Sequence, residues 1–261
     1  MNNTKRFALT FEALTELADE IKTAQAAPQP ALPTLSEALA EYSSLPREAL
    51  FLGLASDGLP VLLNLHDPVP GPLLVSGDAG CGKTAFLRLI ARGVEEMHDP
   101  QAVQYGIITP HTDEWEDCEE SAHCAGVYSV KETRAAEFLD SLSAWAHSAK
   151  DSEPIILLLI DDFEAMTNLD HEAKQNLRWL LLRGPARRVW PIVTLNSRRV
   201  LQVNLWLDLF HTRLFGHMDN PLEGQALAGG RDARLEELMA GVQFKMREGS
   251  EWLSFWIPSL E

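Results

Sequence analysis

Two kinds of apolar pattern alternate along this chain. Continuous apolar blocks predict strands, several of them buried on both faces, whereas apolar residues three or four positions apart predict amphipathic helices. The expected strands span residues 49–54, 60–65, 72–76, 105–109, 126–130, 154–160 and 189–195. The expected helices between them span residues 85–92, 132–149 and 171–182. Strands and helices in this order predict an α/β fold, with a mostly parallel sheet and helices on both of its faces.

Paired apolar runs at the two ends of this core predict flanking β-hairpins. A Ser-Asp-Gly sequence at residues 56–58 separates the first two expected strands and is typical of a tight turn. Residues 242–247 and 252–257 form a second pair. The remaining expected elements are a short helix over residues 35–45 and, in the tail after the apolar residues 213–216, a helical stretch that ends near Met239.

The first residues of the chain have a pattern of their own. Residues 4–27 place Phe7, Phe11 and Leu14 on one face of a predicted amphipathic helix. Residues 28–33 are rich in proline, which breaks a helix and stiffens a linker. We therefore divide the chain into a helix at 1–27, a linker at 28–33 and a main domain at 34–261. The helix either binds a neighbouring subunit or a partner protein, or folds back over its own sheet.

Composition narrows the classes of protein that fit. The chain has 261 residues, 46% of them hydrophobic, and a formal net charge of −16, which argues against nonspecific adhesion to nucleic acid. Acidic residues are concentrated in residues 113–120, which we expect to form a solvated surface loop. No apolar run approaches the roughly 20 residues that span a bilayer. The 3 cysteines make no disulfide framework. We expect a cytoplasmic protein with no membrane partner.

Residues 77–84 carry the clearest chemistry. Their sequence, GDAGCGKT, fits the phosphate-loop pattern G-x-x-x-x-G-K-[ST] between a predicted strand and a predicted helix. The glycines let backbone amides approach an anion, Lys83 would reach the β- and γ-phosphates of ATP, and the Thr84 hydroxyl would bind Mg²⁺. The alternative is a glycine-rich turn before a helix. The expected nucleotide-binding residues are Gly77, Asp78, Ala79, Gly80, Cys81, Gly82, Lys83, Thr84 and Ala85.

A second strand supplies the acids that such a loop needs. The apolar run at residues 154–160 ends in Asp161 and Asp162, at the carboxyl edge of the predicted sheet. We expect Asp161 to hold Mg²⁺ and Asp162 to polarise the attacking water, with Glu164 as the reserve candidate for that second role. The alternative is a buried strand that ends in a solvated acidic turn.

The order of these segments resembles the FtsK/HerA-type pumping ATPases, ring motors that move DNA, with relatives that serve protein secretion. The resemblance rests on FLGLASDGLPVLLNL, GPLLVSGDAGCGKTAFLRLI, IILLLIDDFEAM and VWPIVTLNSRRV, and covers residue 50 to the C-terminus. It implies a RecA-like P-loop NTPase core. In this family Lys83 and Thr84 match the phosphate lysine and the magnesium hydroxyl, and Asp161 matches the magnesium carboxylate.

The resemblance also implies roles for residues outside these two motifs. Asp162 stands where the family usually carries glutamate, which puts the rate of hydrolysis in question. Asn196, or Ser197 beside it, falls at the position of a polar sensor. Arg187 and Arg188 fall near an arginine that in such rings reaches the neighbouring subunit's γ-phosphate. A solvated basic loop is the alternative reading of these two arginines.

The resemblance implies a Mg-ATP hydrolase that assembles into a homo-oligomeric ring, a hexamer by expectation, and couples hydrolysis to movement of DNA. Two other functions remain open at this point. One is an ATP-binding switch or assembly scaffold that barely hydrolyses ATP, and the other is a motor whose cargo is protein.

Overall fold

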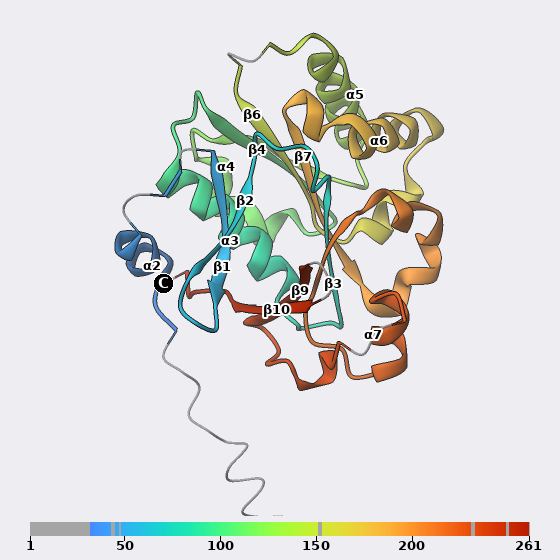
Figure 1. The fold of residues 1–261 in the computed structure, drawn as a ribbon. Helices are drawn as coiled ribbons and strands as arrows, with labels where there is room; N and C mark the ends of the chain where they lie inside the picture. Colours follow the sequence, from blue (N-terminus) through green and yellow to red (C-terminus); the bar gives the residue numbers. More distant parts are fainter. Residues whose placement is uncertain are drawn as a thin grey trace, which may run out of the picture. The chain divides into compact units, whose positions relative to one another are not determined.

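The computed structural model describes residues 32–42, 45–46, 48–150, 153–230, 233–248 and 251–260. The chain divides into two compact units, Met1–Pro33 and Thr34–Glu261. The predicted N-terminal helix lies outside the described residues, as does nearly all of the predicted linker. The fold reported below is that of the second unit (Figure 1).

Within the described residues, the second unit is built on one 10-stranded sheet of order β2-β1-β10-β9-β8-β3-β7-β6-β4-β5. The strands from β8 to β5 in this order run parallel to one another, whereas β2, β1, β10 and β9 extend the sheet with antiparallel pairs. The strands are β1 (Ala49–Ala55), β2 (Pro60–Asn64), β3 (Leu73–Gly77), β4 (Val103–Thr109), β5 (Cys124–Ser129), β6 (Ile155–Ile160), β7 (Val189–Asn196), β8 (Thr212–Phe215), β9 (Gln243–Glu248) and β10 (Glu251–Trp256). The predicted α/β fold with flanking hairpins is confirmed.

Helices cover both faces of the parallel strands. On β3, Leu73 and Val75 belong to the core that contains α3 (Lys83–Met97), whereas Leu74 faces the core of α5 (Thr133–Ser148) and α6 (His171–Arg183). This alternation is the period of two that a strand imposes on its side chains. Both faces of the central strands are therefore buried, which explains their continuous apolar sequence.

The antiparallel strands pack against the side of α3 that the parallel strands leave uncovered. Phe86 of α3 lies 5.3 Å from Phe244 of β9 and 6.4 Å from Phe255 of β10, measured between ring centroids. In Figure 1, β1 and β2 lie over α3, and β1 contacts that helix. The apolar side of α3 is thus buried, and its first turn packs through Phe86 against β9 and β10.

Residues 113–120 differ from the predicted solvated loop. They form a 3-10 helix (Thr112–Trp115) and a short α-helix, α4 (Glu116–Glu119), and the side chains of Trp115 and Cys118 are buried. Asp117 Oδ2 pairs with Arg88 at 2.7 Å and with Arg92 at 2.8 Å, both from α3. Two apolar side chains and two ion pairs therefore fold the acidic segment onto α3.

The segment between β8 and β9 also differs from the prediction. The described residues there contain a short helix, α7 (Pro221–Leu227), and a 3-10 turn (Leu235–Glu237), rather than a helical stretch to Met239. Gly229 and Gly230 adopt φ of +75° and +79° directly after α7, which ends it. The helix predicted over residues 35–45 is also shorter in the structure, where α2 spans Leu35–Glu41.

The parallel arrangement brings several strand ends to one edge of the sheet. The carboxyl ends of β8, β3, β7 and β6 are neighbours in the strand order. Loops that follow neighbouring parallel strands meet at that edge, which is where open α/β sheets bind ligands. In the described part of the chain, no helix has the length and apolar character needed to cross a membrane.

Candidate functional site

The phosphate-loop segment joins the carboxyl end of β3 to the first turn of α3. All of β3 is buried, so the start of the loop is fixed by the sheet. Gly80 and Gly82 adopt φ of +77° and +96°, a region that side chains with a Cβ rarely enter. A Cβ added at Gly80 would meet no atom within 4 Å, so the loop borders open space there. The loop amides and the amino end of α3 can accept an anion at this point.

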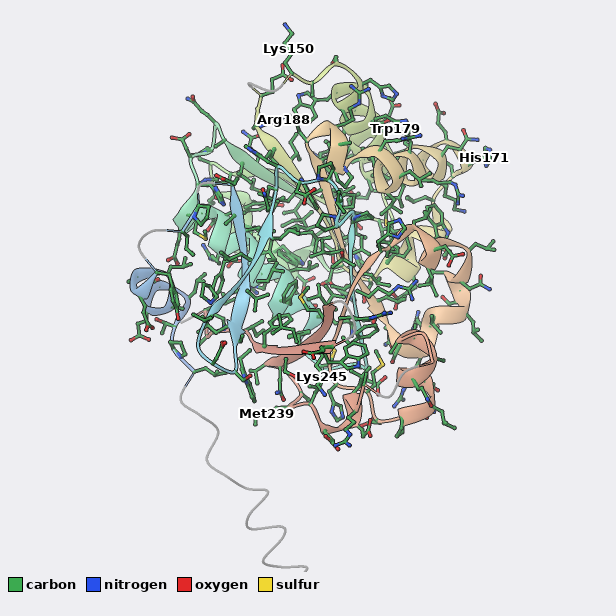
Figure 2. The ribbon with its side chains drawn as sticks, in the orientation of Figure 1. Lys150, His171, Trp179, Arg188, Met239 and Lys245 are labelled. Carbon is green, nitrogen blue, oxygen red and sulfur yellow. The ribbon has the colours of Figure 1, made fainter. Side chains whose placement is uncertain are left out.

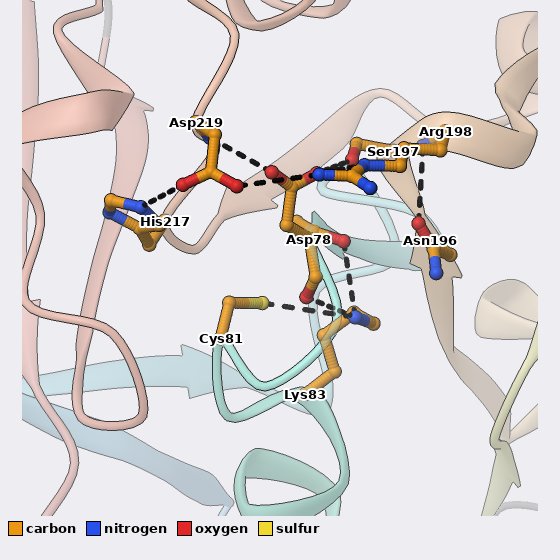
Figure 3. A network of polar contacts seen from close by, with 9 residues as sticks. Asp78, Cys81, Lys83, Asn196, Ser197, Arg198, His217 and Asp219 are labelled. Atoms are coloured by element: carbon orange, nitrogen blue, oxygen red, sulfur yellow. Dashed lines mark hydrogen bonds and ion pairs between the residues drawn. The ribbon is translucent and has the colours of Figure 1, made fainter.

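The ammonium group of Lys83 is folded into this loop (Figure 3). Its Nζ donates hydrogen bonds to the carbonyl oxygens of Gly77 at 3.1 Å and Asp78 at 2.8 Å, and lies 3.8 Å from Sγ of Cys81. The side chain is buried. A positive charge is therefore held within the loop, where phosphate oxygens would be attracted to it.

Asp161, at the end of β6, accepts two hydroxyl hydrogen bonds. Oγ1 of Thr84 donates to its Oδ2 at 2.9 Å, and Oγ1 of Thr194 donates to its Oδ1 at 2.6 Å. Burial raises the pKa of the Asp161 carboxyl above its ordinary value, and the hydrogen bonds from Thr194 and Thr84 offset this only in part. A hydroxyl and a carboxylate side by side are oxygen ligands of the kind Mg²⁺ prefers, and a bound cation would favour the ionised carboxylate. The residues fit Mg²⁺.

Thr194 was not singled out from the sequence. It lies on β7, which separates β3 from β6 in the sheet, so it can reach the acid that follows β6. Its hydroxyl also accepts a hydrogen bond from the backbone amide of Asp162 at 2.9 Å. The one available signal was a polar residue within the otherwise apolar stretch of β7.

The two candidates for polarising water differ in their surroundings. Asp162 is half-buried and has φ of +59°, a conformation that costs free energy in a residue other than glycine. Glu164 is 6% exposed, and its Oε1 lies 3.9 Å from Nε of Arg199. Its Oε2 is buried without a hydrogen-bond partner among the described residues. Burial raises the pKa of Glu164 above its ordinary value.

The predicted sensor residues lie beside the loop, because Asn196 pairs with Gly77 across β7 and β3. The Asn196 side chain accepts a hydrogen bond from the backbone amide of Arg198 at 3.1 Å. Ser197 is buried and donates its hydroxyl hydrogen to Oδ1 of Asp78. Of the two alternatives, Ser197 is the residue that contacts the phosphate loop through its side chain.

Arg198 and Arg199 are further residues at this edge that sequence reasoning missed. The Arg198 guanidinium lies 4.0 Å from Oδ1 of Asp78 and 3.4 Å from Oδ2 of Asp219, while Arg199 faces Glu164. Their position directly after the predicted sensor was the available signal.

Arg187 and Arg188 lie at the other edge of the sheet. They precede β7, which runs parallel to β3, so the length of the strand separates them from the phosphate loop of their own subunit. Lys245 of β9 pairs with Phe215, the last residue of β8, and so marks the carboxyl edge of the parallel strands. Figure 2 shows Arg188 at the opposite end of the unit from Lys245. Arg187 is exposed, whereas Arg188 is half-buried and lines a pocket with Glu48 and Glu153.

Comparison with known proteins identifies a family and similar folds. The sequence profile of the NACHT domain family matches residues 71–213, which include the phosphate loop, β6 and β7 and make up more than half of the chain. No curated protein matches the sequence.

Several solved structures share the fold. EccC (ATPases 2 and 3) of Thermomonospora curvata, in complex with a signal sequence peptide, has a TM-score of 0.68 at 18% identity, over 89% of this chain and 44% of that chain. The pCW3 conjugation coupling protein TcpA, with ATPγS, has a TM-score of 0.68 at 12% identity, over 91% and 72%. The genome packaging NTPase B204 of Sulfolobus turreted icosahedral virus 2, with AMPPCP, has a TM-score of 0.53 at 12% identity, over 75% and 100%.

These likenesses concern the fold, since every identity is low, and the chain spans less than half of the EccC structure. The profile match covers the phosphate-loop segment, β6 and β7 together. The chain belongs to the NACHT domain family, and it is a P-loop ATPase with the fold that its resemblance to the FtsK/HerA-type pumping ATPases implied.

Proposed function

We propose that this protein binds Mg-ATP at residues 77–85, hydrolyses it within a ring of identical subunits, and uses the reaction to move a polymer, with DNA as the first candidate. The observation that carries the proposal is the convergence of three groups at one sheet edge. The Lys83 ammonium is folded into the loop, and the Thr84 hydroxyl donates to the Asp161 carboxylate at 2.9 Å.

Each of these groups has a task in phosphoryl transfer. Loop amides and Lys83 would bind the β- and γ-phosphates of the substrate ATP. Thr84 and Asp161 would hold Mg²⁺, which neutralises charge on phosphate oxygens when it is bound. Catalysis of this kind depends on positioning and on fixed charge, because little covalent chemistry falls to the protein. The buried strands behind these residues supply that fixed placement.

The attacking water needs a carboxylate to orient it. Asp162 is our first candidate because it directly follows the magnesium acid and is half-buried rather than fully enclosed. Glu164 is the second candidate, and its buried Oε2 without a partner among the described residues favours it. The pairing of Glu164 with Arg199 at 3.9 Å argues the other way, because that contact already uses part of its charge.

The arginines at the opposite sheet edge support assembly into a ring. Arg187 and Arg188 are too remote from their own loop to act there, but head-to-tail subunits would bring the amino edge of one sheet to the carboxyl edge of the next. An arginine that reaches a neighbour's γ-phosphate can raise the rate by several orders of magnitude. The exposed Arg187 is better suited than Arg188, which is half-buried and lines a pocket.

Cargo, localisation and the role of the first helix belong to the proposal as well. Similar folds occur in a conjugation coupling protein and a genome packaging NTPase, which support DNA, and in EccC bound to a signal sequence peptide, which supports protein. The net charge of −16 favours protein cargo over a broad DNA surface.

Cysteines without disulfides suit a cytoplasmic setting. The predicted helix at residues 1–27 would bind a neighbouring subunit or a partner protein.

The test is ATP turnover by the full chain, with and without double-stranded DNA, together with its mass in the presence of ATP. DNA-stimulated turnover by an oligomer supports the DNA motor. Turnover that DNA leaves unchanged supports the protein motor. Tight ATP binding with negligible turnover would instead identify a switch or scaffold, the alternative that Asp162 in place of glutamate favours.

A further inference from the structure

Asp78 is a buried acid in a loop suited to receive anions. The residue is 6% exposed, and its Oδ2 accepts a hydrogen bond from the backbone amide of Asp219 at 2.8 Å. Oδ1 accepts a second hydrogen bond, from the hydroxyl of Ser197, and Figure 3 shows both partners around the carboxylate. Like charge beside a phosphate site opposes phosphate binding. A different role must account for an acid at this position.

The two partners of Asp78 come from different strand ends. Ser197 follows β7 and Asp219 follows β8, and β3, which leads into Asp78, lies between these strands in the sheet. One carboxylate thus joins three neighbouring strand ends. Burial raises the pKa of Asp78, but the hydrogen bonds from Ser197 and Asp219 and the charge of Arg198 outweigh it and hold the pKa below its ordinary value. The group stays ionised at neutral pH.

The chain that follows β8 contacts the phosphate loop at two separate places. The carbonyl oxygen of His217 accepts a hydrogen bond from the backbone amide of Asp78 at 3.0 Å. At the other end of the loop, a Cβ added at Gly82 would collide with the backbone carbonyl of Gly241. Within this stretch of chain, Nδ1 of the His217 ring lies 2.8 Å from the carbonyl oxygen of Leu238, so its beginning is joined to a residue near its end. The described residues between 217 and 241 thus meet the phosphate loop at both of their ends, through His217 and Asp219 at one end and Gly241 at the other.

We propose that Asp78 is a positioning residue that couples the phosphate loop to residues 217–230 and 233–241, hereafter the 217–241 segment. The proposal rests on the proposed binding of nucleotide at this loop. Phosphate that fixes the loop would fix the segment through Asp78 and Asp219, and the coupling is reciprocal. Because β9 begins at Gln243, directly after the segment, the nucleotide state would be transmitted to the β9–β10 hairpin.

Hydrogen–deuterium exchange on the full chain tests this coupling. We expect MgADP and MgATPγS to slow exchange in the 217–241 segment of the wild-type protein by at least about fivefold. At nucleotide concentrations that saturate each protein in a fluorescence titration, Asp78→Ala should show clearly less of that protection, because it removes the side-chain contacts to Ser197 and Asp219 and keeps the backbone contact to His217. Asp113→Ala is the matched control, because it removes the same charge from an exposed position in the 3-10 helix at Thr112–Trp115.

A second pair of variants separates coupling from general destabilisation. Ser197→Ala should reduce the nucleotide-dependent protection, and the double variant with Asp78→Ala should lose no more than Asp78→Ala alone, since both remove the same contact. If Asp78→Ala does not fold, Asp78→Asn replaces it, because the amide keeps one acceptor for Ser197 but offers a donor toward Asp219.

Two results would overturn the coupling. One is wild-type protein that binds nucleotide without any change of exchange in the 217–241 segment. The other is an Asp78 variant that binds nucleotide, with whatever affinity, and in which nucleotide slows exchange in the 217–241 segment as much as it does in the wild-type protein. Wild-type protein that binds no nucleotide at all would contradict the proposed function itself, so the two failures are distinguishable.

Discussion

The hydroxyl of Thr84 donates a hydrogen bond of 2.9 Å to Oδ2 of Asp161, across a sequence separation of 77 residues. The contact joins the first turn of α3 to the end of β6, and Thr194 holds the other carboxylate oxygen at 2.6 Å. This geometry leads directly to a prediction about the metal, because neither oxygen of the acid is free to turn away.

Asp161→Asn should bind nucleotide in Mg²⁺ no better than the wild-type protein does in EDTA, and kcat should fall by at least about 100-fold. The amide keeps the shape of the side chain but removes the charge that would hold Mg²⁺. Nucleotide titrations with Mg²⁺ and with EDTA measure the effect. Thr84→Ser is the control and should keep most of the magnesium dependence. An Asp161→Asn protein whose affinity still depends on Mg²⁺ would contradict this assignment.

Lys83→Ala should abolish ATP binding or turnover, because it removes the positive charge that is folded into the loop. The same variant removes hydrogen bonds to Gly77 and Asp78, so its thermal unfolding should be compared with that of the wild type. Lys131→Ala removes an exposed lysine from the turn before α5 and should leave nucleotide affinity unchanged. If Lys83→Ala binds and hydrolyses ATP at full strength, residues 77–84 are not a phosphate loop.

The central strands and the loop could be predicted because their signals are local. An unbroken apolar run such as β6 is buried on both faces, and the GDAGCGKT sequence needs glycines at fixed positions. Thr194 could not be assigned in this way, since its partner Asp161 becomes near only when β7 is placed between β3 and β6. Arg198 and Arg199 were missed for the same reason.

The wrong predictions also have physical causes. The acidic side chains of residues 113–120 are exposed as expected, but the segment is helical and not a loop, because the buried Trp115 packs it onto the core. The helical pattern before β9 was overridden by Gly229 and Gly230, whose left-handed conformations end α7. In both places a single residue type outweighed the average character of the segment.

Asp162→Asn and Glu164→Gln should separate binding from catalysis. Whichever carboxylate orients the water, its amide variant should lower kcat by roughly 100-fold while leaving the affinity for ATPγS within about threefold. The other variant should keep most of its turnover. Single-turnover hydrolysis beside nucleotide titration gives both quantities. Full activity in Asp162→Asn would transfer the role to Glu164, and full activity in both would remove both carboxylates from the mechanism.

We expect the buried thiol of Cys118 to lower the free energy of unfolding at alkaline pH. Burial raises its pKa from 9.0 to about 11. Below pH 9 both the folded and the unfolded chain keep the proton, so the full stability is present. Between pH 9 and 11 the unfolded chain releases the proton first, and the free energy of unfolding should fall by about 2 kcal/mol. Urea unfolding at pH 8 and pH 10.5 measures this, and Cys118→Ala should show a smaller drop. An equal drop in both proteins would contradict the buried thiol as its source.

Mixed rings test whether an arginine from one subunit serves the site of the next. Arg187→Ala should lower turnover by roughly a thousandfold with little change in nucleotide affinity, because its own phosphate loop lies at the other edge of the sheet. Arg183→Ala, a nearby exposed arginine of α6, is the matched control and should keep its activity.

A mixture of Arg187→Ala and Lys83→Ala subunits gives the decisive result. Each variant alone should be inactive, since the first lacks the arginine and the second lacks a working phosphate loop. In a mixed ring, the intact loop of an Arg187→Ala subunit can meet Arg187 of a Lys83→Ala neighbour, so part of the activity should return. The mass of the mixture must show that the two variants assemble together. If activity then does not return, Arg187 does not act at the site of a neighbouring subunit. Arg187 and Arg188 would then belong to a solvated basic loop.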